Sequence, residues 1–369
     1  MIKVLVVVKT LEVNGVSNVI MTYSRNINRE LIEMGFATSE HIAESFKSEI
    51  NNNGDKLFVI NNRDSNPIKY IYKLASIVRR NKYDIVHVHG NSALITMELL
   101  AAMLGGAKVR IAHSHNTTCN HLKLDKMLRP LFNLCYTKGI ACGRAAGEWM
   151  FRKRKFTTIH NGIDLGDFTF SEKSRDEIRS QLGLQGKMVI GHVGAFNYQK
   201  NHEFLIELFQ RHLNIKKDST LLLVGDGQLR EEMEDKVRKK GIEDKVVFFG
   251  ISNDVKSLMM AMDVFVLPSR FEGLPCVLVE AQALGLSCIV SDAVSQEAAL
   301  TDNIAFLPLT ADLDEWCDRI INFKISDRQV GSQIAHAQLA DKGYDIEIST
   351  KALEAIYSNT TKKVEWGAQ

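Results

Sequence analysis

Two glutamates stand eight residues apart in the stretch Phe271-Glu-Gly-Leu-Pro-Cys-Val-Leu-Val-Glu280, on either side of a Gly-Leu-Pro turn. A buried strand is predicted just before them, because residues 264–267 form a short apolar run. Carboxylates repel a bound diphosphate, so Glu272 and Glu280 are better suited to accept hydrogen bonds from sugar hydroxyls. The spacing alone leaves a plainer interpretation open, in which one glutamate begins a helix and the other lies on its surface.

The turn between the glutamates leads into a helix predicted over residues 276–284. Pro275 suits the first turn of that helix, where the N–H that proline lacks is not needed. The N–H groups of Gly273, Leu274 and Cys276 lie at the helix start without partners inside the helix. Such groups, at the positive end of the helix dipole, make this segment a candidate cradle for a diphosphate.

A candidate phosphate-binding cation lies ahead of another predicted helix. Lys200 stands in Gln-Lys-Asn-His after a strand predicted over residues 188–193, where its ammonium can bind a phosphate oxygen as a point charge. An ordinary surface lysine is the alternative. The next strand, residues 220–224, ends in Gly-Asp-Gly, where Asp226 is predicted to cap the following helix.

A segment rich in histidine follows a strand predicted over residues 108–113. His113, His115, His121 and Cys119 fall within nine residues, which raises the question of a zinc site. Their spacing matches no common zinc-ligand pattern, so we expect no metal. A histidine at a strand end is suited to position or polarise a substrate, and a structural, hydrogen-bonded histidine is the alternative.

Two further features of the first half carry weaker signals. Gly15, in Asn-Gly-Val-Ser, opens a helix after the first strand, where a ligand can approach the backbone and an anion is favoured. The segment is not the GxGxxG fingerprint, so no dinucleotide cofactor is expected. His87 and His89 alternate along a predicted strand and share one face, so we expect at least one to be packed and hydrogen-bonded.

Length and composition fit a soluble protein of two domains. The chain has 369 residues, of which 45% are apolar and 24% are charged. The six cysteines include no CxxC pair and are expected to be reduced. The amino terminus predicts a buried strand rather than a signal peptide, and no apolar run reaches the roughly 20 residues of a membrane span.

The charge is unevenly distributed along the chain. Residues 1–165 carry 23 Lys and Arg against 13 Asp and Glu, a net charge of +10, whereas the remainder carries −8. Unless this is a chance distribution of solvated charges, the basic half is expected to meet an anionic membrane surface or a phosphorylated acceptor. Nucleic acid is not expected as a partner, because the basic half lacks aromatic interleaving or a known motif.

Strand-like and helical patterns alternate along the whole chain, which is typical of parallel α/β architecture. We therefore predict two doubly wound parallel-sheet domains that face each other across a cleft, with ligands at the carboxyl ends of the strands. The expected domains are residues 1–165 and 166–344, and residues 345–369 are expected to form a helix that crosses back to the first domain, followed by a polar tail. Strands are predicted at residues 3–8, 84–89, 108–113, 188–193, 220–224, 246–249, 264–267 and 287–290, and helices at 16–31, 68–81, 202–212, 228–240, 255–261, 276–284 and 312–323.

Six motifs in a fixed order give the chain a family resemblance. They are Asn-Gly-Val-Ser from residue 14, His-Ser-His-Asn from 113, His-Asn-Gly-Ile-Asp from 160, Gln-Lys-Asn-His from 199, Val-Gly-Asp-Gly from 224, and the Glu-x7-Glu pair. The set resembles the signature of the family-4 retaining glycosyltransferases, which have the GT-B fold of two Rossmann-like domains. It is most similar to bacterial enzymes of capsule and exopolysaccharide assembly.

The resemblance implies roles for the matching residues of the second half. Lys200 would bind the diphosphate of the donor. Glu272 would contact the hexose and orient its anomeric centre, and Glu280 would hold the ribose hydroxyls. The backbone of Gly273, Leu274 and Pro275 would flank the diphosphate and the sugar, although Pro275 has no N–H to donate.

Three further positions follow from the same resemblance. Gly15 would border the transferred sugar. His115, or less well His113, would contact that sugar near the reacting carbon. The segment Gly-Ile-Ser-Asn, with Ile251, would form a shelf for uracil.

The sequence departs from the family pattern at one position. Family members usually carry an arginine beside the lysine in the diphosphate loop, and this chain has Ala195 there. The substitution removes a bidentate phosphate contact. Either Lys200 and the helix start suffice, or another cation such as Arg270 or Arg144 compensates, or the activity is reduced.

The resemblance therefore implies a metal-independent transferase without a cofactor. It would move a hexose or N-acetylhexosamine from a UDP-sugar to a hydroxyl of a lipid-linked saccharide, with retention, in the cytoplasm at the inner face of the membrane. Two other functions stay open. One is a non-hydrolysing UDP-sugar 2-epimerase, which shares the architecture, and the other is a non-catalytic sugar-nucleotide-binding subunit, which Ala195 makes conceivable.

Overall fold

The computed structural model describes residues 1–12, 14–119, 121–323 and 327–365. The chain forms two compact units. Unit 1 comprises Met1–Gly162 and the chain from Gly343 onward, and unit 2 comprises Ile163–Lys342. The chain thus passes between the units twice, after Gly162 and after Lys342. Within the described ranges, no helix is both long and apolar enough to cross a lipid bilayer.

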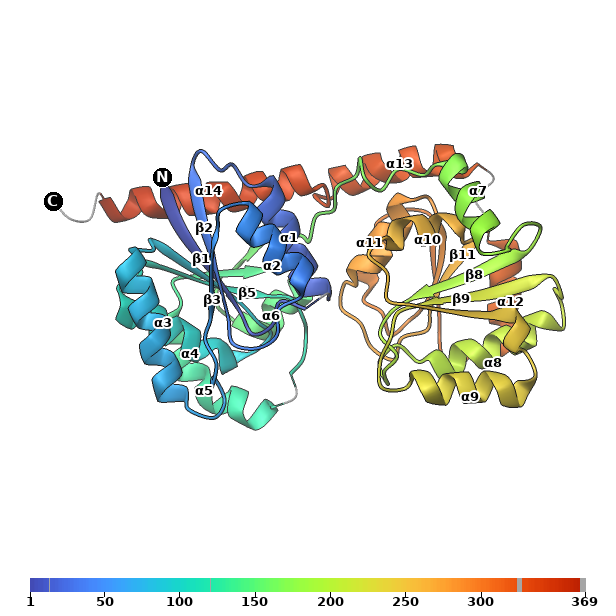
Figure 1. Cartoon of the computed structure of the whole chain (residues 1–369), viewed down its shortest axis with the longest axis horizontal. Coiled ribbons are helices and arrows are strands. Elements are labelled where there is room, and N and C mark those ends of the chain that lie inside the picture. Colours follow the sequence, from blue (N-terminus) through green and yellow to red (C-terminus); the bar gives the residue numbers. More distant parts are fainter. Residues whose placement is uncertain (13, 120, 324–326, 366–369) are drawn as a thin grey trace. The chain divides into compact units, whose positions relative to one another are not determined.

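Unit 1 is built on a parallel sheet with its first strand near the centre (Figure 1). The strand order is β3-β2-β1-β4-β5-β6-β7, so the order reverses between β1 and β4. In such sheets, ligands bind beyond the carboxyl ends of the strands at this reversal, the topological switch point. The strands are β1 (Ile2–Val8), β2 (Ile32–Thr38), β3 (Lys56–Val59), β4 (Ile85–His89), β5 (Val109–Ser114), β6 (Lys138–Ala141) and β7 (Thr157–Thr158).

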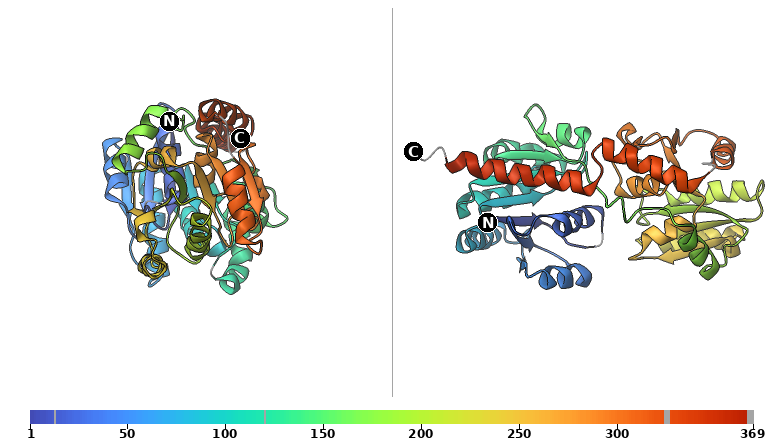
Figure 2. Two further views of the ribbon diagram at one scale, coloured as in Figure 1. Left: turned by 90° about the vertical axis from the view of Figure 1, so that its right-hand side faces the viewer. Right: turned by 90° about the horizontal axis from the view of Figure 1, so that it is seen from above.

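Helices cover the sheet of unit 1. The helices α3 (Pro67–Asn81), α4 (Thr96–Gly105) and α5 (Leu122–Cys135) lie together on one side of it (Figure 1). Helix α1 (Gly15–Asn26) packs beside α14 (Ile346–Glu365), as Figure 2 shows. The remaining helices are α2 (Glu44–Asn52), α6 (Arg144–Phe151) and the short 3-10 helix η1 (Ala93–Ile95).

Helix α14 comes from the end of the chain but is part of unit 1. Its Tyr357 is buried, and the Tyr357 hydroxyl lies 2.7 Å from Nδ1 of His87. A side chain at Gly162 would not fit, because an added Cβ would lie 2.8 Å from the backbone of α14. His160 stacks on Tyr344 with ring centroids 4.4 Å apart. The His-Asn-Gly-Ile-Asp motif therefore packs directly against the returning chain.

Unit 2 repeats the same arrangement of strands. Its parallel sheet has the order β10-β9-β8-β11-β12-β13, so its switch point lies between β8 and β11. All four residues of β11 are apolar and fully buried, which is typical of a central parallel strand covered on both faces. The strands are β8 (Met188–Val193), β9 (Ser219–Val224), β10 (Val246–Gly250), β11 (Val264–Leu267), β12 (Ser287–Ser291) and β13 (Ile304–Leu307).

Two layers of helices enclose the sheet of unit 2. One contains α8 (His202–Leu213), α9 (Arg230–Lys240) and α12 (Leu313–Asn322). The other contains α7 (Glu172–Gln181), α10 (Val255–Ala261), α11 (Cys276–Ala283) and α13 (Arg328–Asp341). Two separate clusters of buried apolar side chains fill the spaces between the sheet and these layers. The 3-10 helices η2 (Glu243–Lys245) and η3 (Gln296–Ala298) complete the unit.

One predicted helix is longer than the helix in the structure. The helix predicted over residues 16–31 ends at Asn26, where the next residue takes extended backbone. The chain then turns and begins β2 at Ile32, which pairs with β1 over seven residues. Residues 27–31 therefore form the turn between α1 and β2 rather than the last part of a helix.

Two predicted helix starts also differ in detail. Asp226 does not cap α9, because that helix begins at Arg230 without a side-chain cap. The Asp226 Oδ1 atom instead accepts a hydrogen bond from the adjacent N–H of Gly227 at 2.7 Å. Pro275 occupies the position just before the first helical residue of α11 rather than the first turn itself.

Gly225 allows two loops at the carboxyl edge of the unit 2 sheet to come into close contact. Gly225 has a φ angle of +136°, which side chains other than glycine rarely adopt. A Cβ at Gly225 would lie 2.2 Å from the carbonyl oxygen of Gly194. The loops after β8 and β9 can therefore approach this closely only with glycine at residue 225.

We expect Gly225→Ala to lower the free energy of unfolding by roughly 3 kcal/mol, because it combines backbone strain with a backbone clash. The matched control is Gly241→Ala, since Gly241 also has a positive φ of +63° but has open space around it. That control should cost only about 1 kcal/mol. Urea unfolding measures both, and equal losses would show that the contact between the loops is unimportant.

Candidate active site

Three loops at the carboxyl edge of the unit 2 sheet are joined by backbone hydrogen bonds. The N–H of Gly194 donates to the carbonyl of Val224 at 2.9 Å, and the N–H of Gly225 donates to the carbonyl of Gly250 at 2.8 Å. These bonds connect the ends of β8, β9 and β10 in turn. The edge is therefore a continuous backbone surface rather than a set of separate loops.

An ion pair spans the switch point of this sheet. The Lys200 Nζ atom lies 2.7 Å from Oε1 of Glu272, and the two side chains are only 14% and 9% exposed. Ser269 Oγ donates a second hydrogen bond to the same carboxylate oxygen at 3.2 Å. Lys200 comes from the loop after β8 and Glu272 from the loop after β11, so both charges stand where a ligand of this fold binds.

Further hydrogen bonds hold these two loops together. The side-chain amide of Asn201 donates to the carbonyl of Pro268 at 3.0 Å, with the Asn201 backbone in the left-handed region at φ +58°. The N–H of Arg270 donates to the carbonyl of Gln199 at 2.8 Å. Lys200 is thus flanked on both sides by residues that are bonded to the opposite loop.

The turn after Glu272 presents backbone groups that remain available. Within the described part of the chain, the N–H groups of Gly273 and Leu274 make no hydrogen bond. An added Cβ at Gly273 would meet no atom within 4 Å, so the space beside it is open. Helix α11 begins directly afterwards, which places two free N–H groups next to a helix start.

Glu280 lies on α11 in a different electrostatic environment. Burial raises the pKa of its carboxyl group to about 7. No hydrogen bond or ion pair to this carboxylate is found in the described ranges. Glu272 is therefore paired with a cation, whereas Glu280 is an unpaired carboxyl that titrates near neutral pH.

Two neutral histidines lie beneath the Lys200 loop. His192, on β8, hydrogen-bonds the carbonyl of Val266 at 2.8 Å, and His202 stacks on Phe196 with ring centroids 3.9 Å apart. Burial lowers the pKa of His192 to about 4 and that of His202 to about 2, and the charge of Lys200 adds to both effects. Both rings are therefore uncharged and add no positive charge beside Lys200.

In unit 1, the candidate residue Gly15 begins helix α1. The side chain of Asn14 caps this helix by accepting a hydrogen bond from the N–H of Ser17 at 3.0 Å. Gly15 is exposed, and an added Cβ would meet no atom within 4 Å. The helix start is thus open to a ligand.

Four histidines of unit 1 form one hydrogen-bonded cluster. His87 Nε2 lies 3.1 Å from His113 Nδ1, and His89 Nδ1 lies 2.8 Å from His115 Nε2. The pairing of β4 with β5 places His89 opposite His113, which explains how residues far apart in sequence meet. Burial lowers the pKa of His115 to about 4, against a smaller opposing effect of Asn161. His115 is therefore held as a neutral imidazole.

Three of these histidines also lie close enough to hold a metal ion. One ring nitrogen from each of His87, His89 and His113 lies within 4.8 Å of the others. The rings are stacked, however, with His87 and His89 at 4.3 Å and His113 and His115 at 4.2 Å between centroids. Nitrogens of His87 and His113 also lie at hydrogen-bonding distance from each other, so a hydrogen bond accounts for their close approach.

Comparison with known proteins settles the family. The chain is 31% identical to EpsF of Bacillus subtilis (strain 168), a candidate glycosyltransferase, over 98% of this chain and 97% of the relative. The family model described as Glycosyltransferase Family 4 matches residues 13–167. The model described as Glycosyl transferases group 1 matches residues 174–328.

The chain belongs to glycosyltransferase family 4. Another relative is the UDP-Gal:alpha-D-GlcNAc-diphosphoundecaprenol alpha-1,3-galactosyltransferase of Escherichia coli, which is 28% identical over 71% of each chain. Among solved structures, Anabaena HepE in complex with UDP superposes with a TM-score of 0.80 at 18% identity, covering 97% of this chain and 100% of HepE. These findings confirm the predicted resemblance and the GT-B fold of two parallel-sheet domains.

The predicted site residues of this glycosyltransferase divide between the units. Unit 2 brings Lys200 and Glu272 into direct contact, next to the backbone at Gly273, Leu274 and Pro275. Ile251 is exposed just beyond the end of β10, two strands away from β8. His115 and Gly15 belong to unit 1, and Ala195 and Glu280 to unit 2.

Ala195 is exposed at the start of the loop that carries Lys200. Of the two cations considered as substitutes for the missing arginine, Arg270 belongs to the same edge of unit 2. Its guanidinium donates to the carbonyl of Tyr198 at 2.8 Å and lies 4.3 Å from the centre of the Tyr198 ring. Arg144 belongs to unit 1 and pairs with Glu148 at 2.8 Å. Within unit 2, Arg270 therefore contacts the loop that contains Ala195 and Lys200.

Sequence reasoning missed two residues of this edge. Ser269 bonds Glu272, and nothing in its type or spacing marks it out. Arg230 begins α9 with its guanidinium beside Gly250, 3.4 Å from where a Cβ would be. A cation in the first turn of a helix is unfavourable, because it faces the positive end of the helix dipole. This unusual position could have identified Arg230 as a candidate in the sequence.

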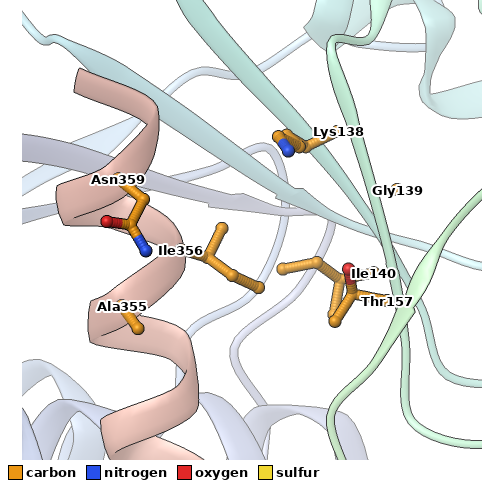
Figure 3. A pocket seen from close by; sticks show the side chains of 7 residues that line it. All are labelled: Lys138, Gly139, Ile140, Thr157, Ala355, Ile356 and Asn359. Carbon is orange, nitrogen blue, oxygen red and sulfur yellow. The ribbon is translucent and has the colours of Figure 1, made fainter. Parts of the chain in front are cut away.

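Unit 1 contains a hollow lined by residues of β6, β7 and α14 (Figure 3). It lies between α14 and the strands β6 and β7, and Lys138 and Thr157 are the first residues of those strands. The hollow is thus at the amino ends of the strands. Ligands of this fold bind at the carboxyl ends, so we assign the hollow no part in the reaction.

The low pKa of the buried histidines predicts acid sensitivity. Their folded-state pKa lies below the ordinary value of 6.5, so the unfolded chain binds more protons, and the free energy of unfolding falls as pH drops below about 6.5. We expect His202→Phe to keep the packing on Phe196 and to remove about 2 kcal/mol of the loss between pH 7 and pH 5. Urea unfolding at both pH values measures this.

The matched control for that experiment is His41→Phe, because His41 is exposed. It should leave the loss between pH 7 and pH 5 unchanged. An equal loss in His202→Phe and the wild type would contradict the assignment of His202 as a buried neutral ring.

Proposed function

We propose that this glycosyltransferase moves a hexose or N-acetylhexosamine from a UDP-sugar to a hydroxyl of a lipid-linked saccharide, with retention, in the assembly of bacterial surface polysaccharide. The observation that carries the proposal is the Lys200–Glu272 ion pair at the switch point, beside the free N–H groups of Gly273 and Leu274. A cation, two N–H donors and a carboxylate are the groups that a sugar diphosphate requires.

The comparisons support the choice of donor and acceptor. HepE has been solved with UDP and with UDP-glucose, which supports a uridine diphosphate donor. The Escherichia coli relative is named for a diphosphoundecaprenol-linked acceptor, which supports a lipid-linked saccharide. We accordingly propose that the enzyme works in the cytoplasm at the inner face of the membrane.

In the proposed reaction, Lys200 stabilises the departing diphosphate. The acceptor oxygen bonds to the anomeric carbon, the bond from that carbon to UDP breaks, and the acceptor proton passes to a diphosphate oxygen on the same face. Negative charge then builds up on the leaving group, where an ammonium and preorganised N–H donors are most effective. We propose that these groups make a metal ion or other cofactor unnecessary.

The two glutamates hold hydroxyl groups rather than act as nucleophiles. Donor binding draws Lys200 toward phosphate, which frees the Glu272 carboxylate to accept hydrogen bonds from the hexose. Glu280 accepts from the ribose, and Ile251 supports the uracil beside Gly250. From unit 1, Gly15 borders the sugar and the neutral His115 contacts it near the reacting carbon.

Removing either member of the ion pair should impair both donor binding and turnover. We expect Lys200→Met and Glu272→Gln each to lower kcat about 10²- to 10³-fold, because charge stabilisation at the leaving group or sugar is lost. The matched control is Lys256→Met, since Lys256 lies on α10 and pairs with the exposed Asp167. Thermal shifts with UDP and a panel of UDP-sugars, followed by product analysis with a lipid-linked acceptor, measure the effects.

Three outcomes of that experiment would count against the proposal. A wild type that neither binds nor turns over any nucleotide sugar would rule out the transferase. An epimerised UDP-sugar formed without acceptor would indicate a 2-epimerase instead. Loss of turnover after chelation by EDTA would show that a metal ion is required.

The raised pKa of Glu280 predicts a pH dependence of UDP binding. The carboxyl is protonated below about pH 7 in the free protein, whereas the form that accepts ribose hydrogen bonds is ionised. Affinity for UDP should therefore rise about tenfold from pH 6 to pH 8. Glu280→Gln is the control, because its remaining slope reports the titration of UDP itself. Equal slopes in calorimetric titrations of the two proteins would disprove the role of Glu280.

A further inference from the structure

Helix α5 exposes an apolar stripe along its whole length. Leu124, Met127, Leu131 and Leu134 are 40%, 69%, 38% and 68% exposed. They recur at intervals of three and four residues, which places them on one face of the helix. Single exposed apolar residues are common, but a continuous stripe on a surface helix indicates an interaction surface.

The opposite face of α5 is anchored in unit 1. Phe132 and Cys135 are fully buried, and α5 packs on α4 and η1. The carboxylate of Asp125 is also buried, where it pairs with Arg129 at 2.8 Å. The helix is therefore held with its apolar stripe facing away from the core of unit 1.

Basic residues frame the stripe. Lys123 and Lys126 are exposed on α5 itself. The exposed segment Arg-Lys-Arg-Lys at residues 152–155 lies near the other end, because the Arg154 guanidinium donates to the carbonyl of Asn133 at 3.2 Å. Residues 122–155 hold nine Lys and Arg against two Asp and Glu.

We propose that α5 lies flat on an anionic lipid bilayer. Its stripe enters the boundary between headgroups and acyl chains, and the framing Lys and Arg bind the lipid phosphates. A helix with one apolar face, cationic flanks and a length of about 21 Å fits that boundary in the plane of the membrane. Cations attract an anionic leaflet most strongly at low ionic strength.

A second copy of the chain is a poorer occupant of the same stripe. Two copies would bring their basic frames together, and like charges facing each other oppose association. A single helix face also offers much less than the roughly 800 Å² per partner of a stable protein interface. The charge around the stripe therefore favours lipid over a second copy. This inference rests on the α5 surface alone and does not depend on the proposed transfer reaction.

The test is co-sedimentation of the full chain with vesicles. The wild type should bind vesicles of phosphatidylcholine with about 30% phosphatidylglycerol at low salt, and should not bind pure phosphatidylcholine vesicles. Replacing two stripe residues, Met127→Glu with Leu134→Glu, should weaken binding at least about tenfold. Replacing two framing cations, Lys153→Glu with Lys155→Glu, should do the same.

Matched controls place the same changes on unit 2. Val330→Glu with Ile334→Glu alters two apolar side chains of α13 that are 48% and 53% exposed. Lys173→Glu with Lys239→Glu alters two exposed cations. Both controls should bind anionic vesicles like the wild type. The thermal unfolding temperature of every variant shows whether it is folded.

Four results would overturn the proposal. They are no binding of the wild type to anionic vesicles, equal binding to neutral vesicles, unchanged binding of the stripe variant, and a wild-type dimer that the stripe variant converts to a monomer. The last result would assign the stripe to a second copy. Failure of UDP binding or sugar transfer would leave the membrane surface unaffected, so the two proposals fail separately.

Discussion

The ion pair between Lys200 and Glu272 is the constraint on which the candidate site depends. Both side chains are mostly buried, so removal of one charge would leave the other poorly solvated and unpaired. The loops after β8 and β11 must therefore stay together, and the hydrogen bonds of Asn201 and Arg270 across the same gap serve this need. The apolar strands β8 and β11 contribute indirectly. They are neighbours in the sheet, so the two loops that follow them begin side by side.

The histidines close to Lys200 carry no charge. His192 and His202 lie near the Lys200 ammonium, and burial keeps both rings neutral. The clustered histidines of unit 1 (His87, His89, His113 and His115) also contact one another, and the pKa of each is lowered by burial. These six rings therefore serve as uncharged polar groups. Glu280 differs from them, because burial brings the pKa of its carboxyl close to neutral pH.

Three predominantly apolar elements of unit 2 were predictable at residue level. Strands β8 and β11 and helix α10 have the bounds that the sequence pattern predicts. Strand β2 was not predicted, although Ile32, Met34 and Phe36 alternate with Glu, Gly and Ala, and it pairs with both β1 and β3. The Asp226 cap was wrong for a related reason. The loop after β9 is shaped by its contact with Gly194, which no local signal encodes.

By itself, the sequence determined the two parallel-sheet domains, the family and the loops that carry candidate chemistry, because periodicity and short motifs depend on neighbouring residues. Only the tertiary structure decided that Lys200 touches Glu272, that Ser269 bonds the same carboxylate, and that the Arg270 guanidinium bonds the Tyr198 carbonyl in the Lys200 loop. The contacts of Lys200 with Glu272 and of Arg270 with Tyr198 each join residues 72 positions apart, and strand order places them together. The same holds for the histidine cluster, whose members meet only because β4 and β5 pair in register.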